Sequence, residues 1–261
     1  MTHHMRDPHV EAVYYEIGSG EGISFGSPPV LALTNRLGTF ELANGKLTIC
    51  PTAHYASGEE ARAVFDPFLR AWELDADLTR NIGSIRFKYL SVHKVDRNPP
   101  EPNSGSVSIA VDAAELMLLG GSASVHITQN AYPPPPDDFR TTPEVEVAYG
   151  RWRGFRERRE PLPSMAYAVL TLLESVAGSR REAAGTLQVD MRVLDTIGRL
   201  SSTKGDGATV RKFEAGASLQ PLTGSESTWL EAAVRRLVRR LGEHAAGAPL
   251  SLIAMKDLPT S

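Results

Sequence analysis

A run of four prolines at residues 133–136 constrains the fold of this chain more than any other feature. Proline lacks a backbone N–H and has a fixed φ, so the run cannot join a sheet ladder and favours an extended polyproline conformation. Before the run, most apolar residues alternate with polar ones as in strands, and after residue 160 they recur with the period of a helix. The sequence therefore predicts two parts that join between residues 130 and 162.

Charge and cysteine content exclude several classes of protein. The 261 residues include 28 Lys+Arg and 31 Asp+Glu, a net charge of -3, which excludes a generally basic nucleic-acid binder. The single cysteine excludes an internal disulfide framework and a cysteine-based zinc site. Because the sequence has neither an apolar stretch of about 18 residues nor a secretory signal at its amino terminus, we expect a cytoplasmic protein without membrane contact.

The first part contains a clear hairpin signal. Apolar and polar residues alternate on both sides of Asn44-Gly45 over residues 39–49. Asn-Gly accepts the positive φ values of a type I′ turn, so this stretch is predicted to be a two-stranded hairpin. Further strands are expected at residues 10–17, 85–89, 106–111 and 122–128.

A helix is predicted to follow the hairpin. Ser57 and Glu60 have the spacing of a capping box, and apolar residues then recur at helical spacing. Pro67 lies within this pattern, so we expect either a kink or a second helix that begins there. The fold class predicted for residues 10–132 is therefore α+β, with an antiparallel sheet packed against the helix of Val64, Phe68 and Trp72.

The second part is predicted to be a small helical bundle over residues 161–246. Its expected helices span residues 163–177, 180–187 and 191–200, and the last begins near Ser225. Residues 133–160 are expected to form a Pro- and Arg-rich connector, and residues 247–261 a tail. The last helix has an apolar stripe suited to docking on the first part or on a second copy, so we expect a homodimer through Trp229, Leu237 and Leu241.

Two glycine-containing stretches do not match nucleotide-binding motifs. Residues 18–26 are rich in glycine, but Ile23 stands where the third glycine of a dinucleotide fingerprint would be, and Pro28 follows in place of a helix. Residues 203–206 lack the upstream glycine of a phosphate-binding loop. We interpret both stretches as ordinary loops and expect no cofactor.

Histidines provide the next candidates. His126-Ile127-Thr128 resembles the His-x-Thr unit of two-histidine phosphoesterases, which need two such units facing one cleft, but His93-Lys94-Val95 lacks the hydroxyl residue. Cys50 and His54, with these histidines, do not have the short paired spacings of zinc ligands. We therefore favour histidines with structural roles and expect no bound metal.

The most unusual composition lies at residues 151–159, where five arginines occur with Trp152 and Phe155. Guanidinium groups pair with phosphates and aromatic rings stack on unpaired bases, so this segment is a candidate contact for single-stranded nucleic acid. The alternative, which we favour, is an interdomain strap whose aromatic rings are buried and whose arginines pair with Glu157, Glu160 and other carboxylates. The candidate nucleic-acid-binding residues are Arg151, Trp152, Arg153, Arg156 and Arg158.

The last helix contains an Arg-x4-His spacing at Arg239 and His244. With the expected four helices, this spacing resembles the HEPN superfamily, helical bundles found in bacterial toxins and defence proteins. In active members the arginine and histidine of two protomers meet in a metal-independent ribonuclease site, so the resemblance implies Arg239 and His244 as catalytic residues. The chain departs from the active pattern at Arg240, where active members usually carry Asn, Asp or His.

These observations favour a non-enzymatic binding or regulatory protein. In this hypothesis the β-rich part presents loops to a ligand or partner that the sequence does not identify, and the helical part mediates association. The alternatives are a HEPN-like endoribonuclease and an RNA-binding protein that does not cleave. Whether Arg239 and His244 face a shared groove or solvent distinguishes these classes.

Overall fold

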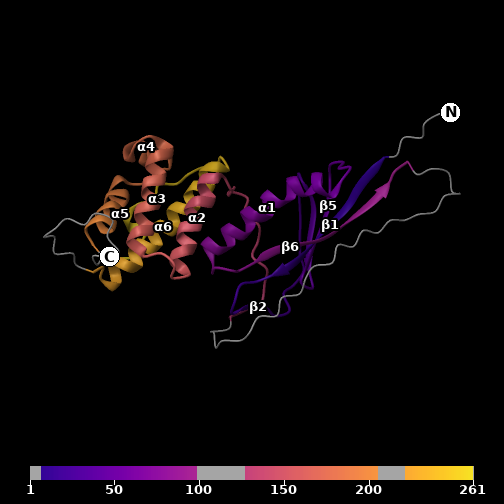
Figure 1. Ribbon diagram of the computed structural model, residues 1–261, viewed down its shortest axis with the longest axis horizontal. Helices are drawn as coiled ribbons and strands as arrows, with labels where there is room; N and C mark the ends of the chain where they lie inside the picture. The colour runs from indigo at the N-terminus through magenta and orange to yellow at the C-terminus, as the bar shows by residue number, and fades with distance from the viewer. Residues whose placement is uncertain (1–6, 99–126, 205–220, 261) are drawn as a thin grey trace. The chain divides into compact units, whose positions relative to one another are not determined.

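The computed structural model describes residues 7–98, 127–204 and 221–260 (Figure 1). They belong to two compact units, Met1–Pro135 and Pro136–Ser261, and the boundary between them along the sequence falls within the proline run. The strand expected at residues 106–111, and most of that expected at 122–128, lie outside the described residues.

The first unit contains a five-stranded antiparallel sheet and one long helix, which confirms the predicted α+β class. The strand order is β3-β4-β5-β1-β6, and β2 forms a separate parallel pair with β7. The strands are β1 Pro8–Gly18, β2 Ile23–Phe25, β3 Leu31–Asn35, β4 Gly38–Ala43, β5 Lys46–Pro51, β6 Arg86–Asp96 and β7 Ile127–Gln129.

The predicted hairpin is formed by β4 and β5. Asn44 and Gly45 have φ values of 51° and 74°, as a type I′ turn requires. The register pairs Phe40 with Ile49, and both side chains are fully buried. The alternation in the sequence therefore places one face of the hairpin in the core.

Helix α1, Gly58–Thr79, covers the sheet without interruption at Pro67. Ser57 accepts the backbone N–H of Glu60 at 3.1 Å and so caps the first turn. Trp72 is buried as expected, but Val64 is 37% exposed and Phe68 only partly buried. In the buried stripe, Phe65 and Leu69 take the places expected for Val64 and Phe68, beside Trp72, Ala61 and Ala76.

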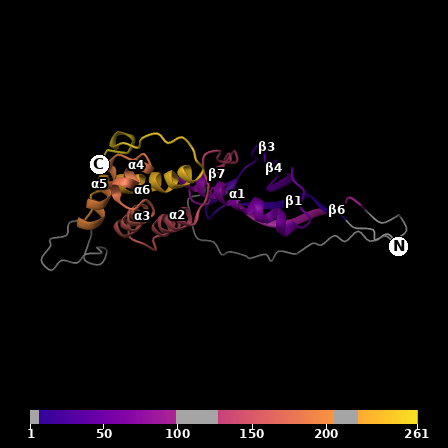
Figure 2. The same cartoon turned by 90° about the horizontal axis from the view of Figure 1, so that it is seen from above.

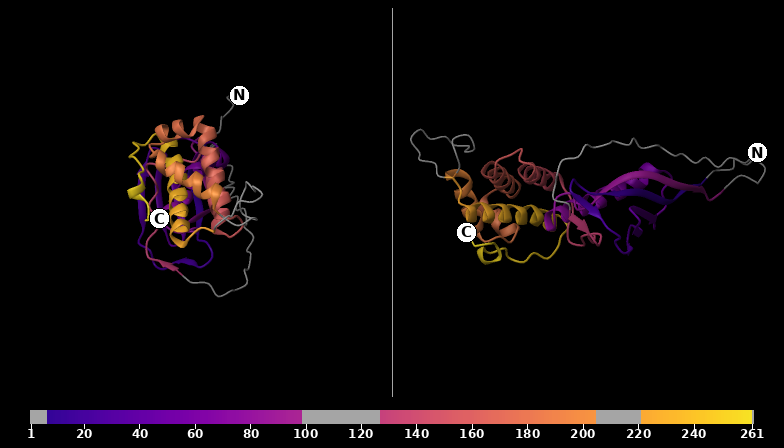
Figure 3. Two further views of the ribbon diagram at one scale, coloured as in Figure 1. Left: turned by 90° about the vertical axis from the view of Figure 1, so that its left-hand side faces the viewer. Right: turned by 90° about the horizontal axis from the view of Figure 1, so that it is seen from below.

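The second unit is helical, as predicted, but its first helix begins earlier than expected. Its helices are α2 Pro143–Arg156, α3 Leu162–Ala177, α4 Arg180–Thr186, α5 Met191–Thr203 and α6 Gly224–Ala245, followed by a 3₁₀ turn at Met255–Asp257. Helix α6 lies beside α2 and α3 (Figures 2 and 3). Helix α2 occupies much of residues 133–160, the range expected to be a connector, and Ile253, in the range expected to be a tail, is buried and bridges to Val189.

Local sequence explains why α2 forms. Thr142 caps the helix by accepting the N–H of Val145 at 3.3 Å, and Pro143 occupies the first turn, where its missing N–H costs nothing. Apolar residues then recur at helical spacing and are buried: Val145, Ala148, Tyr149 and Trp152.

The apolar stripe of α6 is in the core of this unit. Trp229 and Leu237 are each 1% exposed, and α2, α3 and α5 all contact the helix. Leu241 is also buried. The stripe to which we attributed dimerisation is therefore covered by the same chain, so a homodimer would need another surface.

Candidate functional site

The arginine-rich segment forms the end of α2 and the turn that follows it. Trp152 is buried at 1% exposure, with its ring 6.0 Å from that of Tyr149. A ring enclosed in this way is not accessible to a nucleic-acid base. Trp152 thus lacks the exposure that base stacking by this residue would require.

Four of the five arginines bind carboxylates within the second unit. Arg153 contacts Glu157 at 2.6 Å, and Arg159 contacts the same carboxylate. Hydrogen bonds from Arg159 and Arg153 lower the pKa of Glu157 below its usual value. The remaining pairs join Arg156 to Glu231 of α6 at 2.7 Å and Arg151 to Glu160 at 3.3 Å. A buried Trp152 and paired arginines are features of the strap interpretation, but Phe155 is only partly buried and the ion pairs lie within one unit.

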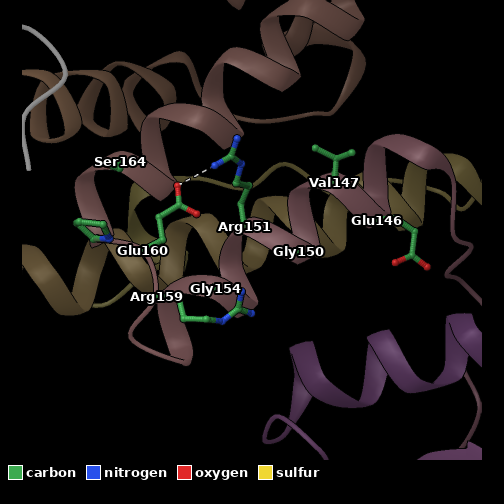
Figure 4. Close-up of a pocket in the computed structure, with 9 residues that line it drawn as sticks. Glu146, Val147, Gly150, Arg151, Gly154, Arg159, Glu160 and Ser164 are labelled. Carbon is green, nitrogen blue, oxygen red and sulfur yellow. Dashed lines mark hydrogen bonds and ion pairs between the residues drawn. The ribbon is translucent and has the colours of Figure 1, made fainter.

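A groove of about 560 Å³ runs along the exposed face of α2 (Figure 4). Val147, which is 54% exposed, and Gly150 lie along it, and a Cβ added at Gly150 would meet no atom within 4 Å. Figure 4 shows Arg151 and Glu160 pointing toward each other across the groove. The lining residues are Glu146, Val147, Gly150, Arg151, Gly154, Arg159, Glu160, Pro161 and Ser164.

A second hollow of about 450 Å³ adjoins the turn between α2 and α3. Phe155, Arg158 and Leu162 line it, and it shares Arg159 and other residues with the groove. Arg158 is exposed and has a φ of 59°. The hollow therefore combines an aromatic ring with exposed positive charge.

Arg239 and His244 lie on α6 but differ in environment. The guanidinium group of Arg239 contacts Asp138 at 2.9 Å and also binds Glu243, whereas His244 is exposed. Five residues along an ideal helix correspond to a rotation of about 140° around its axis. Helix α6 therefore does not direct these two side chains to the same side, and the ion pairs of Arg239 orient it toward its own unit.

Arg240 and Glu243 form a buried network that sequence reasoning missed. Arg240 is fully buried and donates to Glu243 at 2.7 Å, to the carbonyl oxygen of Leu187 at 2.8 Å and to that of Ser251 at 2.7 Å. It thus fastens the end of α4 and the carboxy-terminal segment to α6. A signal was present in the sequence, because Arg240 follows Leu237 by three residues on the apolar stripe.

The charges around Glu243 keep its carboxylate ionised. Burial alone would raise the pKa of Glu243, but hydrogen bonds and charges from Arg236, Arg239 and Arg240 hold it below its usual value. Burial lowers the pKa of Arg240, an effect that the charge of Glu243 opposes. The network fits a structural role better than a catalytic one, because its charges bind each other and are enclosed.

A smaller hollow of about 240 Å³ lies between α1 and the sheet of the first unit. The Tyr15 hydroxyl donates to Asp66 at 2.7 Å, and Arg62 contacts the other oxygen of Asp66 at 3.0 Å while lying over the ring of Tyr89. Burial is the main cause that raises the pKa of Tyr15, and the hydrogen bond to Asp66 and the charge of Asp66 raise it further. These residues were not identified from the sequence, since only tertiary packing brings β1, α1 and β6 together. Their charges are paired with one another, which leaves no evident reactive group.

The remaining sequence candidates do not come together as a metal centre within the described part of the chain. His93 lies 3.5 Å from Glu11 and His54 lies 3.1 Å from Asp7, whereas His126 is outside the described residues. Across residues 7–98, 127–204 and 221–260 there is no group of three or more side chains suited to hold a metal ion. In the same ranges no helix is both long and apolar enough to cross a bilayer.

The two glycine-containing stretches differ in how much of each is described. Residues 18–26 include a turn around Gly22, whose φ is 75°, followed by β2. Lys204 pairs with Glu226 at 3.4 Å, while the next two residues lie outside the described part.

Comparison with protein families, curated proteins and solved structures finds no match to this chain. The functional argument therefore rests on the geometry of the chain itself.

Proposed function

We propose that this chain is a non-enzymatic binding protein and that the groove on α2 is the surface by which its helical unit contacts another protein. The observation that carries the proposal is the composition of the groove. Exposed Val147 and the bare backbone at Gly150 lie beside the charged residues Glu146 and Arg151. The lining is mostly polar, with Val147 as its exposed apolar side chain, and non-obligate protein interfaces are about as polar as the rest of a protein surface.

Glycine contributes a specific physical advantage to such a surface. Without a Cβ at Gly150, a partner can approach the α2 backbone more closely than at any larger residue. The side chain of Arg151 is 54% exposed and uses one of its nitrogens for Glu160, so further donors of its guanidinium group remain for a partner. The groove can therefore offer both shape and charge complementarity.

The endoribonuclease hypothesis has less support. Its two residues, Arg239 and His244, point in different directions, and the guanidinium group of Arg239 is already bound by Asp138 and Glu243. A general acid or base must reach the reacting group within hydrogen-bonding distance. Such a site would require Arg239 to exchange these carboxylates for RNA.

Photocrosslinking in the cells that produce the protein tests the proposal. A benzophenone amino acid is placed at Val147 in the groove, and at Val176 on α3 as a matched control of similar exposure, 56% against 54%. We expect covalent protein adducts on denaturing gels from position 147 and none from position 176. Absence of protein adducts at position 147, or equal adducts at both positions, would contradict the proposed surface.

A single-stranded RNA contact is the second candidate function, and the hollow beside the α2–α3 turn is the observation that favours it. Phe155 and Arg158 line this hollow together, and Arg158 is exposed. Fluorescence anisotropy with a labelled single-stranded RNA measures the affinity and its salt dependence. An Arg158→Gln change should lower the salt slope by about 0.7 if that residue contacts one phosphate. Arg235→Gln on α6 is the control.

A further inference from the structure

We infer that the occupant of the groove is the same groove on a second copy of this chain, joined by an antiparallel contact between the two α2 helices. This inference rests on the proposed function, because it takes the groove to be a protein-contact surface. It goes further by naming the partner and the residues that meet.

The charge pattern along α2 is self-complementary. The first turn contains Glu144 and Glu146, and the last turn contains Arg153 and Arg156, with Arg151 just before them. Two such helices in parallel would place like charges together, whereas two antiparallel helices place the acidic end of each beside the basic end of the other. A two-fold axis produces this arrangement twice, once in each direction.

The register of the contact follows from helix geometry. We place the two-fold axis at the height of the midpoint between Ala148 and Tyr149. Because each residue advances the helix by about 1.5 Å, this choice fixes which residues of the two copies lie at the same height along the helices. Glu146 of one copy then lies at the level of Arg151 of the second copy. The same register places Val147 at the level of Gly150. The four residues that α2 contributes near the centre of the groove, Glu146, Val147, Gly150 and Arg151, are therefore all opposite residues of the same set in the second copy.

The open backbone at Gly150 favours a particular crossing angle. A Cβ added at Gly150 would meet no atom within 4 Å, whereas Gly154 is buried against Glu160, so the gap lies at Gly150, on the i±4 ridge that packs in crossings of about −50°. When the two helices cross with this negative angle, the edge of the contact face that contains Glu146 in one copy turns toward the edge that contains Arg151 in the second copy. The two Val147 side chains meet near the axis, and Gly150 lets the backbones approach. The opposite hand would bring the two Glu146 residues together.

The expected contact is weak. A single pair of crossing helices, with the adjoining wall formed by Pro161 and Ser164, buries less than the roughly 1,200 Å² of total surface at the lower limit of stable interfaces. The apolar stripe of α6 cannot add to it, because Trp229 and Leu237 are buried within the unit. We therefore expect a monomer–dimer equilibrium with a micromolar dissociation constant.

Sedimentation equilibrium of the full chain tests the inference, over concentrations from about 1 to 100 µM, which bracket a dissociation constant in the micromolar range. Wild-type protein should pass from monomer to dimer. Val147→Arg should weaken the dimer at least tenfold, whereas the equally exposed control Val176→Arg should leave it unchanged. A wild-type chain that stays monomeric at the highest concentration would overturn the inference, as would a dimer indifferent to Val147→Arg.

Charge reversal tests the register separately from the location. Glu146→Arg and Arg151→Glu should each weaken the dimer, because each places like charges opposite one another in both symmetric contacts. Combining them in one chain restores opposite charges at both contacts and should recover at least part of the affinity. A double variant weaker than either single variant would contradict the antiparallel register. Circular dichroism of each variant confirms that α2 has remained folded.

Cysteine crosslinking keeps the inference testable if a charged variant fails to fold. In a Cys50→Ser background, which removes the exposed natural thiol, Val147→Cys should form an intermolecular disulfide on mild oxidation, and Val176→Cys should not. No disulfide at position 147 contradicts the inference. If photocrosslinks at this position instead reach a different protein, the proposed function stands and the self-association is wrong.

Discussion

Replacing Arg240 with alanine should destabilise the second unit more than any other single arginine change on α6. The change removes a guanidinium group that is fully buried and bound to Glu243, and it leaves the carbonyl oxygens of Leu187 and Ser251 without this donor. Removing one member of a buried ion pair costs about 3–5 kcal/mol, and each carbonyl left unsatisfied costs about 1–3 kcal/mol. Since Arg236 and Arg239 still bind Glu243, most of the ion-pair cost does not arise, and the two carbonyl oxygens set the expected loss at about 2–6 kcal/mol in total.

Urea denaturation followed by circular dichroism measures this loss as a change in the free energy of unfolding of the helical unit. Arg235→Ala is the matched control, because Arg235 lies on the same helix and is half-exposed, and its change should stay within about 0.5 kcal/mol. Glu243→Gln should also destabilise the unit, since it weakens the attraction of three arginines at once. If Arg240→Ala cost no more than Arg235→Ala, the assignment of Arg240 as the link between α6 and the carboxy-terminal segment would be refuted.

Three further predictions concern other parts of the chain. Burial, and to a lesser extent the charges of Arg97 and His54, lowers the pKa of His9 in the folded chain, so the unfolded chain binds a proton at His9 more readily. The free energy of unfolding should therefore fall as the pH drops below about 6.5, and melting curves of His9→Gln should show a smaller fall. Gly83→Ala should destabilise the first unit by about 1–3 kcal/mol, because Gly83 has a φ of 81° and an added Cβ would lie 2.6 Å from Gly20. Gly185→Ala should instead stabilise the second unit by up to about 1 kcal/mol, because Gly185 lies in α4 and an added Cβ would meet no atom within 4 Å. Changing Arg153, Arg156 and Arg158 to Gln should lower the melting temperature and leave RNA affinity unchanged, because it removes ion pairs within the second unit. Trp152→Ala should lower the free energy of unfolding by about 3–5 kcal/mol, because the ring is buried. RNA affinity lost without loss of stability in the arginine variant would contradict this expectation.

Local signals predicted the fold where short stretches of sequence determine conformation. Asn44 and Gly45 readily accept the positive φ values that a type I′ turn needs, and such a turn joins the two strands of a hairpin. Ser57 is a second local signal, because its side chain accepts a backbone N–H in the first turn of α1. These elements need no knowledge of distant residues.

Helix α2 was missed although its local signals were present. Thr142-Pro143 begins it and apolar residues follow at helical spacing, but Gly150 and Gly154 lower helix propensity, and the prolines and arginines of residues 133–160 led us to expect a connector. Tertiary packing outweighs that propensity, because Trp152 and Tyr149 bury large rings within the unit.

The groove could not be predicted from the sequence in the same way. Its lining joins one face of α2 to Glu160 and Ser164 beyond the turn, and this contact depends on how α3 packs against α2. The sequence identified Arg151 as a binding residue but not Val147, whose significance lies in its exposure. The resemblance to HEPN proteins likewise remains a prediction, since helical spacing alone does not define the surroundings of Arg239 and His244.

The placement of the three tryptophans makes the chain its own optical reporter. Trp72 is enclosed in the first unit, where its indole donates to the carbonyl oxygen of Pro133 at 2.9 Å, and Trp152 and Trp229 are enclosed in the second. An indole shielded from water emits at shorter wavelength than one in solvent, so each unit has an intrinsic fluorophore that shifts to the red when that unit opens. In a chain with Trp152→Phe and Trp229→Phe the tryptophan emission would therefore come only from the first unit, whose unfolding could be followed by itself without any added dye.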